Sequence, residues 1–129
     1  MDQPRYLIDS NIVIGYLSNK LPADGMYFMH SIIDAVPNIS VVTKIEVLSF
    51  NAPEEHYKTL SSFINDATIL SLTNPVLEAS IDIRKKHRTK LPDAIIAATA
   101  IANELVLLTR NVSDFKNIDG LQIIDPHNL

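Results

Sequence analysis

Residues 94 to 108 read AIIAATAIANELVLL, and this stretch decides the class of fold. Its first part, Ala94 to Ala102, is apolar on nearly every side, as in a helix that is enclosed by protein. Its second part, Leu105 to Leu108, is a short continuous apolar run, as in a strand of a buried parallel sheet. A buried helix followed so closely by a buried strand indicates α/β architecture.

Strands and helices continue to alternate along the rest of the chain. The sequence predicts further strands at residues 6–8, 39–42, 67–72 and 121–124. It predicts other helices at residues 12–17, 26–33 and 76–87, and two more that start near Thr43 and Pro53. This alternation predicts a three-layer α/β/α sandwich with a central, mainly parallel β-sheet.

The size and composition fit a single domain that spans residues 1–129. The hydrophobic fraction is 47% and the charged fraction 20%, so the chain can bury an ordinary core. It has no cysteine, which excludes disulfides and thiolate zinc sites. It has no apolar stretch of bilayer length and no signal-peptide pattern at residues 1–5, so we expect a cytoplasmic protein with no membrane partner. The net charge of −4 does not indicate nucleic-acid binding, but local basic patches could still bind phosphates.

Four carboxylates stand next to the predicted elements. Asp9 and Glu46 follow the first and second strands, Asp93 opens the apolar helix, and Asp114 follows the strand after that helix. The carboxyl ends of parallel strands meet at one edge of a sheet, so we expect the four acids to gather there. Acids that gather repel one another unless a cation lies between them.

Mg²⁺ or Mn²⁺ is the simplest cation for such a site, because hard divalent ions prefer oxygen ligands. We predict that four acids are both metal ligands and catalytic groups: Asp9, Glu46, Asp93 and Asp114. Such a centre suits phosphodiester hydrolysis, because the ion lowers the pKa of a bound water and offsets charge on the phosphate. A carboxylate that does not bind the metal could accept the proton of that water.

Each acid also has a structural explanation. Asp9 could cap the helix that follows it. Thr43 and Glu46 have the spacing of a capping box, with threonine at the N-cap. Asp93 and Asp114 fall where the first turn of a helix favours an acid. These explanations do not account for why all four acids stand at corners between strands and helices.

Polar residues beside the acids could orient the carboxylates or a metal-bound water. We predict this supporting role for five residues: Ser10, Asn11, Thr43, Thr109 and Asn111. The alternative is ordinary turn chemistry, because serine, threonine and asparagine favour such corners in any protein.

Four segments of the chain together resemble the PIN-domain family. They are Asp9-Ser10-Asn11, Thr43-x-x-Glu46, Leu91 to Ala100 and Leu108 to Phe115. Within the family they look most like the VapC-type toxin ribonucleases of bacterial toxin–antitoxin pairs. The resemblance implies a PIN-like fold and a Mg²⁺- or Mn²⁺-dependent endoribonuclease that uses the four acids. It also implies a homodimer, and an antitoxin protein that blocks the site.

A dense basic run, Arg84 to Lys90, leads directly towards Asp93. Beside a metal centre, such a run is placed to contact the RNA backbone. The predicted RNA contacts are Lys86, Arg88, Lys90 and, before Asp114, Arg110. The alternative is a solvated helix end, because cations favour the C-terminus of a helix.

Other functions stay open at this point. The chain could be a PIN-fold nuclease that processes RNA outside toxin–antitoxin systems, or a non-catalytic domain that binds a partner. It could also be a phosphatase or phosphotransfer module with Asp9 as the nucleophile. Residue 11 is asparagine, so the Asp-x-Asp pair common in aspartate-based phosphatases is missing, which weighs against this last interpretation.

Overall fold

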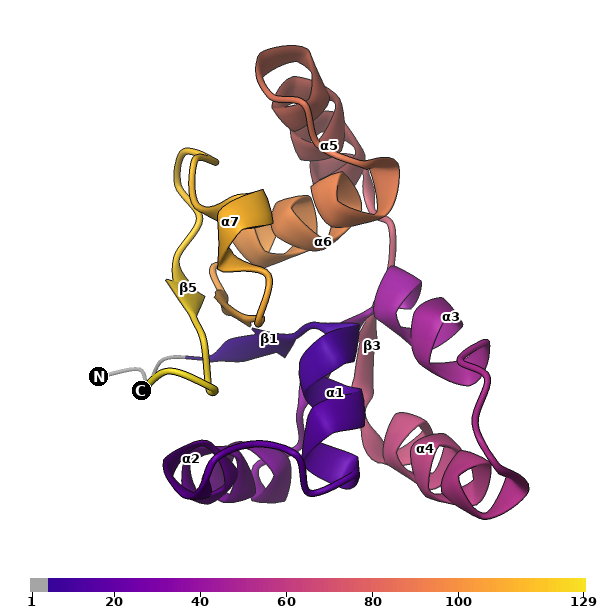
Figure 1. Cartoon of the computed structure of the whole chain (residues 1–129). Helices are drawn as coiled ribbons and strands as arrows, with labels where there is room; N and C mark the ends of the chain where they lie inside the picture. Colours follow the sequence, from indigo (N-terminus) through magenta and orange to yellow (C-terminus); the bar gives the residue numbers. More distant parts are fainter. Residues whose placement is uncertain (1–4) are drawn as a thin grey trace.

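Five short strands form one sheet at the centre of the structure, a computed structural model that describes residues 5–129 (Figure 1). The strands are β1 (Tyr6–Ile8), β2 (Asn38–Ser40), β3 (Thr68–Leu70), β4 (Val106–Leu108) and β5 (Ile123–Ile124). The helices are α1 (Ser10–Leu17), α2 (Ala23–Asp34), α3 (Val41–Leu48), α4 (Glu54–Asp66), α5 (Asn74–Lys86), α6 (Leu91–Ala102) and α7 (Val112–Phe115). Within residues 5–129 no helix combines the length and the apolar character needed to cross a bilayer.

Helices cover both faces of the sheet, which confirms the predicted three-layer sandwich. The strand order is β3-β2-β1-β4-β5, and every pairing is parallel. Helices α1, α2 and α4 pack on one face, and α5, α6 and α7 pack on the other (Figure 1). Side chains of the central strands alternate accordingly: Leu7 and Leu107 join the core under α6, whereas Ile8 and Leu108 join the core under α1.

The apolar helix predicted from the sequence is α6, and it is deeply buried. Ala94, Ile96 and Ala98 are each no more than 1% exposed. A turn at residues 103–104 connects α6 directly to β4, so the helix runs antiparallel to the strands. This direction brings the N-terminus of α6 to the edge of the sheet where the strands end.

The second strand ends two residues earlier than the sequence predicts, and the next helix begins earlier. Strand β2 stops at Ser40, and α3 begins at Val41 rather than near Thr43. The Ser40 hydroxyl caps α3, because it accepts the N–H groups of Val42 at 3.0 Å and Thr43 at 3.2 Å. The capping-box interpretation of Thr43 and Glu46 is therefore wrong, since Glu46 lies well inside the helix.

The two outer strands are also shorter than predicted. Only residues 68–70 and 123–124 pair, whereas the sequence predicts 67–72 and 121–124. Both lie at the edges of the sheet and have a single neighbouring strand, so their ladders end where that neighbour ends.

The chain changes faces between β1 and β4, which are neighbours in the sheet. After β1 it enters α1 on one face, and after β4 it enters α7 on the other (Figure 1). In open α/β sheets, a crevice that binds ligands forms at the carboxyl ends of two strands whose connections part in this way.

We expect Gly25→Ala to destabilise the protein by roughly 1–3 kcal/mol, because the new Cβ would overlap the backbone carbonyl of Pro126. Gly15→Ala in α1 is the matched control, since its Cβ would meet side-chain atoms alone, the flexible end of Leu21 at 3.0 Å and the ring of His127 at 3.9 Å. Alanine has a higher helix propensity than glycine, so the control substitution should destabilise the protein less than Gly25→Ala, or stabilise it. Urea unfolding measures the free energy of unfolding of both variants. Equal losses of this free energy would contradict the packing of the C-terminal segment on α2.

Candidate metal centre

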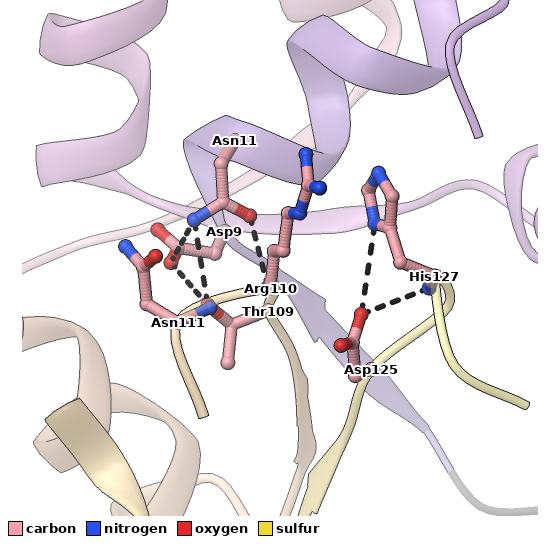
Figure 2. A network of polar contacts seen from close by, with 7 residues as sticks. All are labelled: Asp9, Asn11, Thr109, Arg110, Asn111, Asp125 and His127. Carbon is pink, nitrogen blue, oxygen red and sulfur yellow. Dashed lines mark hydrogen bonds and ion pairs between the residues drawn. The ribbon is translucent and has the colours of Figure 1, made fainter. Parts of the chain in front are cut away.

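Asp9 lies at the carboxyl ends of β1 and β4 and is held there from several sides (Figure 2). Its backbone N–H donates to the Leu108 carbonyl at 2.9 Å, which joins the ends of the two strands. Its side chain caps α1 and is only 4% exposed. The Oδ1 atom accepts the Ser10 N–H at 2.8 Å, and Oδ2 accepts the Thr109 hydroxyl at 2.8 Å and the Asn11 amide at 3.1 Å.

Asn11 and Thr109 also connect the first turn of α1 to the loop after β4 (Figure 2). The Asn11 Oδ1 accepts the Arg110 N–H at 3.1 Å. The Thr109 Oγ1 accepts the Asn111 N–H at 3.1 Å. Of the residues predicted to support the acids, Asn11 and Thr109 thus contact Asp9 directly, whereas Asn111 takes part through its backbone and its side chain makes no cap bond.

Glu46 comes from α3 and meets Asp9 through Ser10. The Ser10 hydroxyl donates to Glu46 Oε1 at 3.1 Å, while the Ser10 N–H donates to Asp9. One serine therefore bridges two carboxylates that are 37 positions apart in the sequence. The Thr43 hydroxyl, one turn earlier in α3, is buried and makes no hydrogen bond to another described residue.

Asp93 reaches the same edge of the sheet by a route that the sequence interpretation did not foresee. It lies in the first turn of α6, after α5 and not after a strand, so its predicted place at a strand-to-helix corner is wrong. The antiparallel course of α6 brings it to the edge. Asp114, in α7 after β4, is exposed and lines the same cleft as Asp93.

The four acids influence one another electrostatically. Burial raises the pKa of Asp9 above its ordinary value, although its hydrogen bonds oppose the change. Burial also raises the pKa of Glu46, and the charges of Asp9 and Asp93 raise it further. The pKa of Asp93 is raised by burial and then by the charges of Asp9 and Asp114, against an opposing effect of Lys90.

No cation within residues 5–129 forms an ion pair with these acids. The two ion pairs there join Asp82 to Lys86 and Asp125 to His127. The oxygen donors and the uncompensated negative charge fit a hard divalent cation. In the described part of the chain, however, no three acids or histidines already converge tightly enough to surround an ion. Glu46 is partly buried and Asp114 is exposed.

The basic run lies partly beside the acids. Arg88 and Lys90 line the cleft that also contains Asp93 and Asp114. Lys86 is not among the lining residues and pairs instead with Asp82 at 3.2 Å. The exposed Arg110 follows β4, and its backbone is bound to Asn11.

The sequence interpretation missed other residues of this cleft. They are His87, Thr89, Ser113, Asn117 and Ile118. Each lies within six positions of Asp93 or Asp114 in the chain, which is the one signal that could have identified them.

Comparisons with known proteins agree with the fold. A family model described as PIN domain matches residues 6–121. A toxin–antitoxin complex from Klebsiella pneumoniae is similar at 29% identity and a TM-score of 0.73, over 96% of this chain and 99% of that one. The DNA-bound VapBC of Salmonella typhimurium has 22% identity and a TM-score of 0.78, with 96% and 99% covered. VapBC2 of Rickettsia felis, bound to promoter DNA, has 19% identity and a TM-score of 0.76, with 93% and 97% covered. No curated protein matches the chain.

The raised pKa values predict that the metal-free protein loses stability as the pH rises. Between the ordinary pKa of an unfolded carboxyl group and the raised pKa values of Asp9, Glu46 and Asp93, the folded protein binds more protons than the unfolded chain. The stabilisation is therefore complete below the ordinary values and is lost as the pH passes the raised ones.

We expect Asp93→Asn to raise the melting temperature at pH 7 in EDTA by a few degrees and to flatten the fall in stability between about pH 4 and pH 7. Asp24→Asn, a change of an exposed acid in α2, is the control. Thermal unfolding across this range is the measurement. A variant whose stability falls with rising pH as steeply as that of the wild type would contradict the mutual repulsion of the acids.

Proposed function

The chain belongs to the PIN-domain family, and we propose that it is a Mg²⁺- or Mn²⁺-dependent endoribonuclease that acts as the toxin of a toxin–antitoxin pair. One observation carries the nuclease proposal: Ser10 donates hydrogen bonds to both Asp9 and Glu46, Asp93 and Asp114 line one cleft, and none of the four acids forms an ion pair within residues 5–129. Carboxylates that lie near the carboxyl ends of parallel strands, with no ion-pair partner within residues 5–129, fit a site for a divalent cation.

The metal would be held by the four acids, with Asp9 as the most rigid ligand. Three hydrogen bonds fix the Asp9 carboxylate before any ion arrives. Ser10 keeps Glu46 within reach of the same ion. When bound, a divalent ion supplies an activated water and offsets the charge on the phosphate. Whichever of Glu46 and Asp93 is not committed to the ion can accept a proton at its carboxylate oxygen.

The RNA strand would enter along the cleft beside Asp93. Arg88 and Lys90 stand in its wall, so they can hold the phosphates that flank the bond to be cleaved. Single-stranded RNA fits this arrangement, because its backbone can bend into a cleft and leave the bases unstacked.

The likeness to known toxin–antitoxin complexes supports the toxin part of the proposal. The Klebsiella pneumoniae complex has the highest identity of the structures compared above, and the match covers 96% of this chain and 99% of that one. We propose that such an antitoxin binds this chain and blocks the acidic site, as the family resemblance implies. Cleavage that is suppressed by a co-expressed small protein from a neighbouring gene would support the toxin role over RNA processing outside such systems.

We expect Asp93→Asn to reduce RNA cleavage in Mg²⁺ or Mn²⁺ by a factor on the order of 10³, because it removes a charged ligand from the site of reaction. The circular-dichroism spectrum should be unchanged, since the side chain is only partly buried. Calorimetry with Mn²⁺ should show binding to the wild type and much weaker binding to the variant. Asp24→Asn is the control for the loss of one negative charge. Full activity of the Asp93 variant, or no Mn²⁺ binding by the wild type, would contradict the proposal.

We expect Arg88→Gln and Lys90→Gln to weaken RNA binding severalfold, with a larger effect on KM than on kcat. Each change should also lower the slope of log affinity against log salt concentration by about 0.7, the value for one phosphate contact on a single strand. Lys58→Gln is the matched control, because Lys58 is an exposed lysine of α4. Fluorescence anisotropy with labelled RNA at several salt concentrations measures the slope, and an unchanged slope would remove these residues from the RNA path.

A further inference from the structure

The cleft beside Asp93 has room for more than a phosphate. It encloses about 300 Å³, at the lower end of the range of about 300–1,000 Å³ that is usual for small-molecule sites. Besides the acids Asp93 and Asp114 and the two cations, four side chains with hydrogen-bonding groups line it: His87, Thr89, Ser113 and Asn117. The proposed contacts of the cations to phosphates leave these four side chains without a role.

One wall of the cleft is the connection between α5 and α6, whose side chains alternate. The backbone is extended at His87 and again at Lys90. Arg88 and Lys90 are exposed, whereas His87 and Thr89 are half-buried. Successive side chains of an extended segment point to opposite sides. The cations therefore lie at the rim of the cleft, and the imidazole and the hydroxyl lie deeper in its wall.

Another wall is one side of α7 and of the turn that follows it. Helix α7 packs beside α6 (Figure 1). The lining residues from this segment are Ser113, Asp114, Asn117 and Ile118, which share one side of a helical turn because they come in two pairs four positions apart. Ser113 and Asn117 are exposed, whereas Ile118 is only 6% exposed and adds an apolar surface to the cleft.

The hydrogen-bonding groups of these walls are not used within the described protein. No side-chain hydrogen bond within residues 5–129 involves His87, Thr89, Ser113 or Asn117. The Asn117 amide can donate and accept at the same time, and the His87 ring is flat. Proteins recognise an unpaired base of RNA with groups of this kind: the base stacks on an aromatic ring, and polar side chains bind its edge.

We propose that this cleft holds one unpaired nucleobase of the RNA, next to the phosphate that is cleaved. The Asn117 amide binds the edge of the base, the His87 ring stacks on its face, and Ile118 supplies an apolar contact. Arg88 and Lys90 hold the neighbouring phosphates at the rim. The inference rests on the proposed function and deepens it, because cleavage then depends on the base at one position of the strand.

The first test is the base preference at the cut. A pool of unstructured RNA with a randomised segment is cleaved in Mn²⁺, and the ends of the products are sequenced. At one position beside the cut the wild type should enrich one base roughly fivefold or more, as two hydrogen bonds to a base edge allow. Asn117→Ala should abolish this enrichment. Asn65→Ala, which changes an exposed asparagine of α4, is the matched control and should retain it. A wild type without preference, or a preference that survives in Asn117→Ala, would overturn the proposal.

An abasic nucleotide separates contacts to the base from contacts to the backbone, because it keeps the sugar and the phosphate. It is placed at each position of a labelled RNA oligonucleotide in turn, and binding is measured by fluorescence anisotropy in EDTA. At one position the loss of the base should weaken binding to the wild type roughly fivefold or more. His87→Ala should lose most of this difference, and His87→Phe should keep it, because phenylalanine also stacks. No difference in the wild type, or an undiminished one in a natively folded His87→Ala, would overturn the proposal.

These outcomes are distinct from those that test the nuclease proposal. RNA cleavage without base preference would overturn the base site and leave the proposed function standing. Base-dependent binding in EDTA, without cleavage in Mg²⁺ or Mn²⁺, would contradict the nuclease proposal and leave the base site standing.

Discussion

A buried carboxylate governs the organisation of this protein. Asp9 stands where the chain changes faces of the sheet, and it is almost inaccessible to water. An ionised group in such a place needs compensation, which here comes from donors on both sides of the change: Ser10 and Asn11 from α1, and Thr109 from the loop after β4. The hydrogen bonds that stabilise this charge are thus the same bonds that join the two halves of the fold.

The neighbouring acids act against this stability. Glu46 and Asp93 add negative charge to a place that burial already makes unfavourable for it. A protein selected for stability alone would have neutral side chains there. A bound divalent cation would resolve this conflict.

The sequence predicted the layers of the fold, because these depend on patterns that neighbouring residues reveal. It also predicted that four acids gather at one place. In the structure Asp9 and Glu46 share Ser10, and Asp93 and Asp114 line one cleft, but within residues 5–129 no three acids converge on one point. The apolar stretch at residues 94–108 could only be an enclosed helix and strand, and α6 and β4 are buried as expected. The competition between strand and helix just after Ser40 was harder to predict. Val41 and Val42 favour a strand by their branched side chains, but the Ser40 hydroxyl begins the helix. The cleft residues beside Asp93, such as His87 and Asn117, are brought together by packing between segments, which no single stretch of sequence shows. The metal-binding and catalytic roles of the acids remain predictions.

The hydrogen bond between Asp9 and Thr109 joins residues 100 positions apart. During synthesis on the ribosome, the central strand β1 appears first and must wait for almost the entire polypeptide before β4 can pair with it. The site that contains the four acids is therefore among the last parts of the molecule to assemble. If the protein is a toxin, its nascent chains stay inactive until translation is nearly complete. A co-translated antitoxin can then already be present when the active site forms.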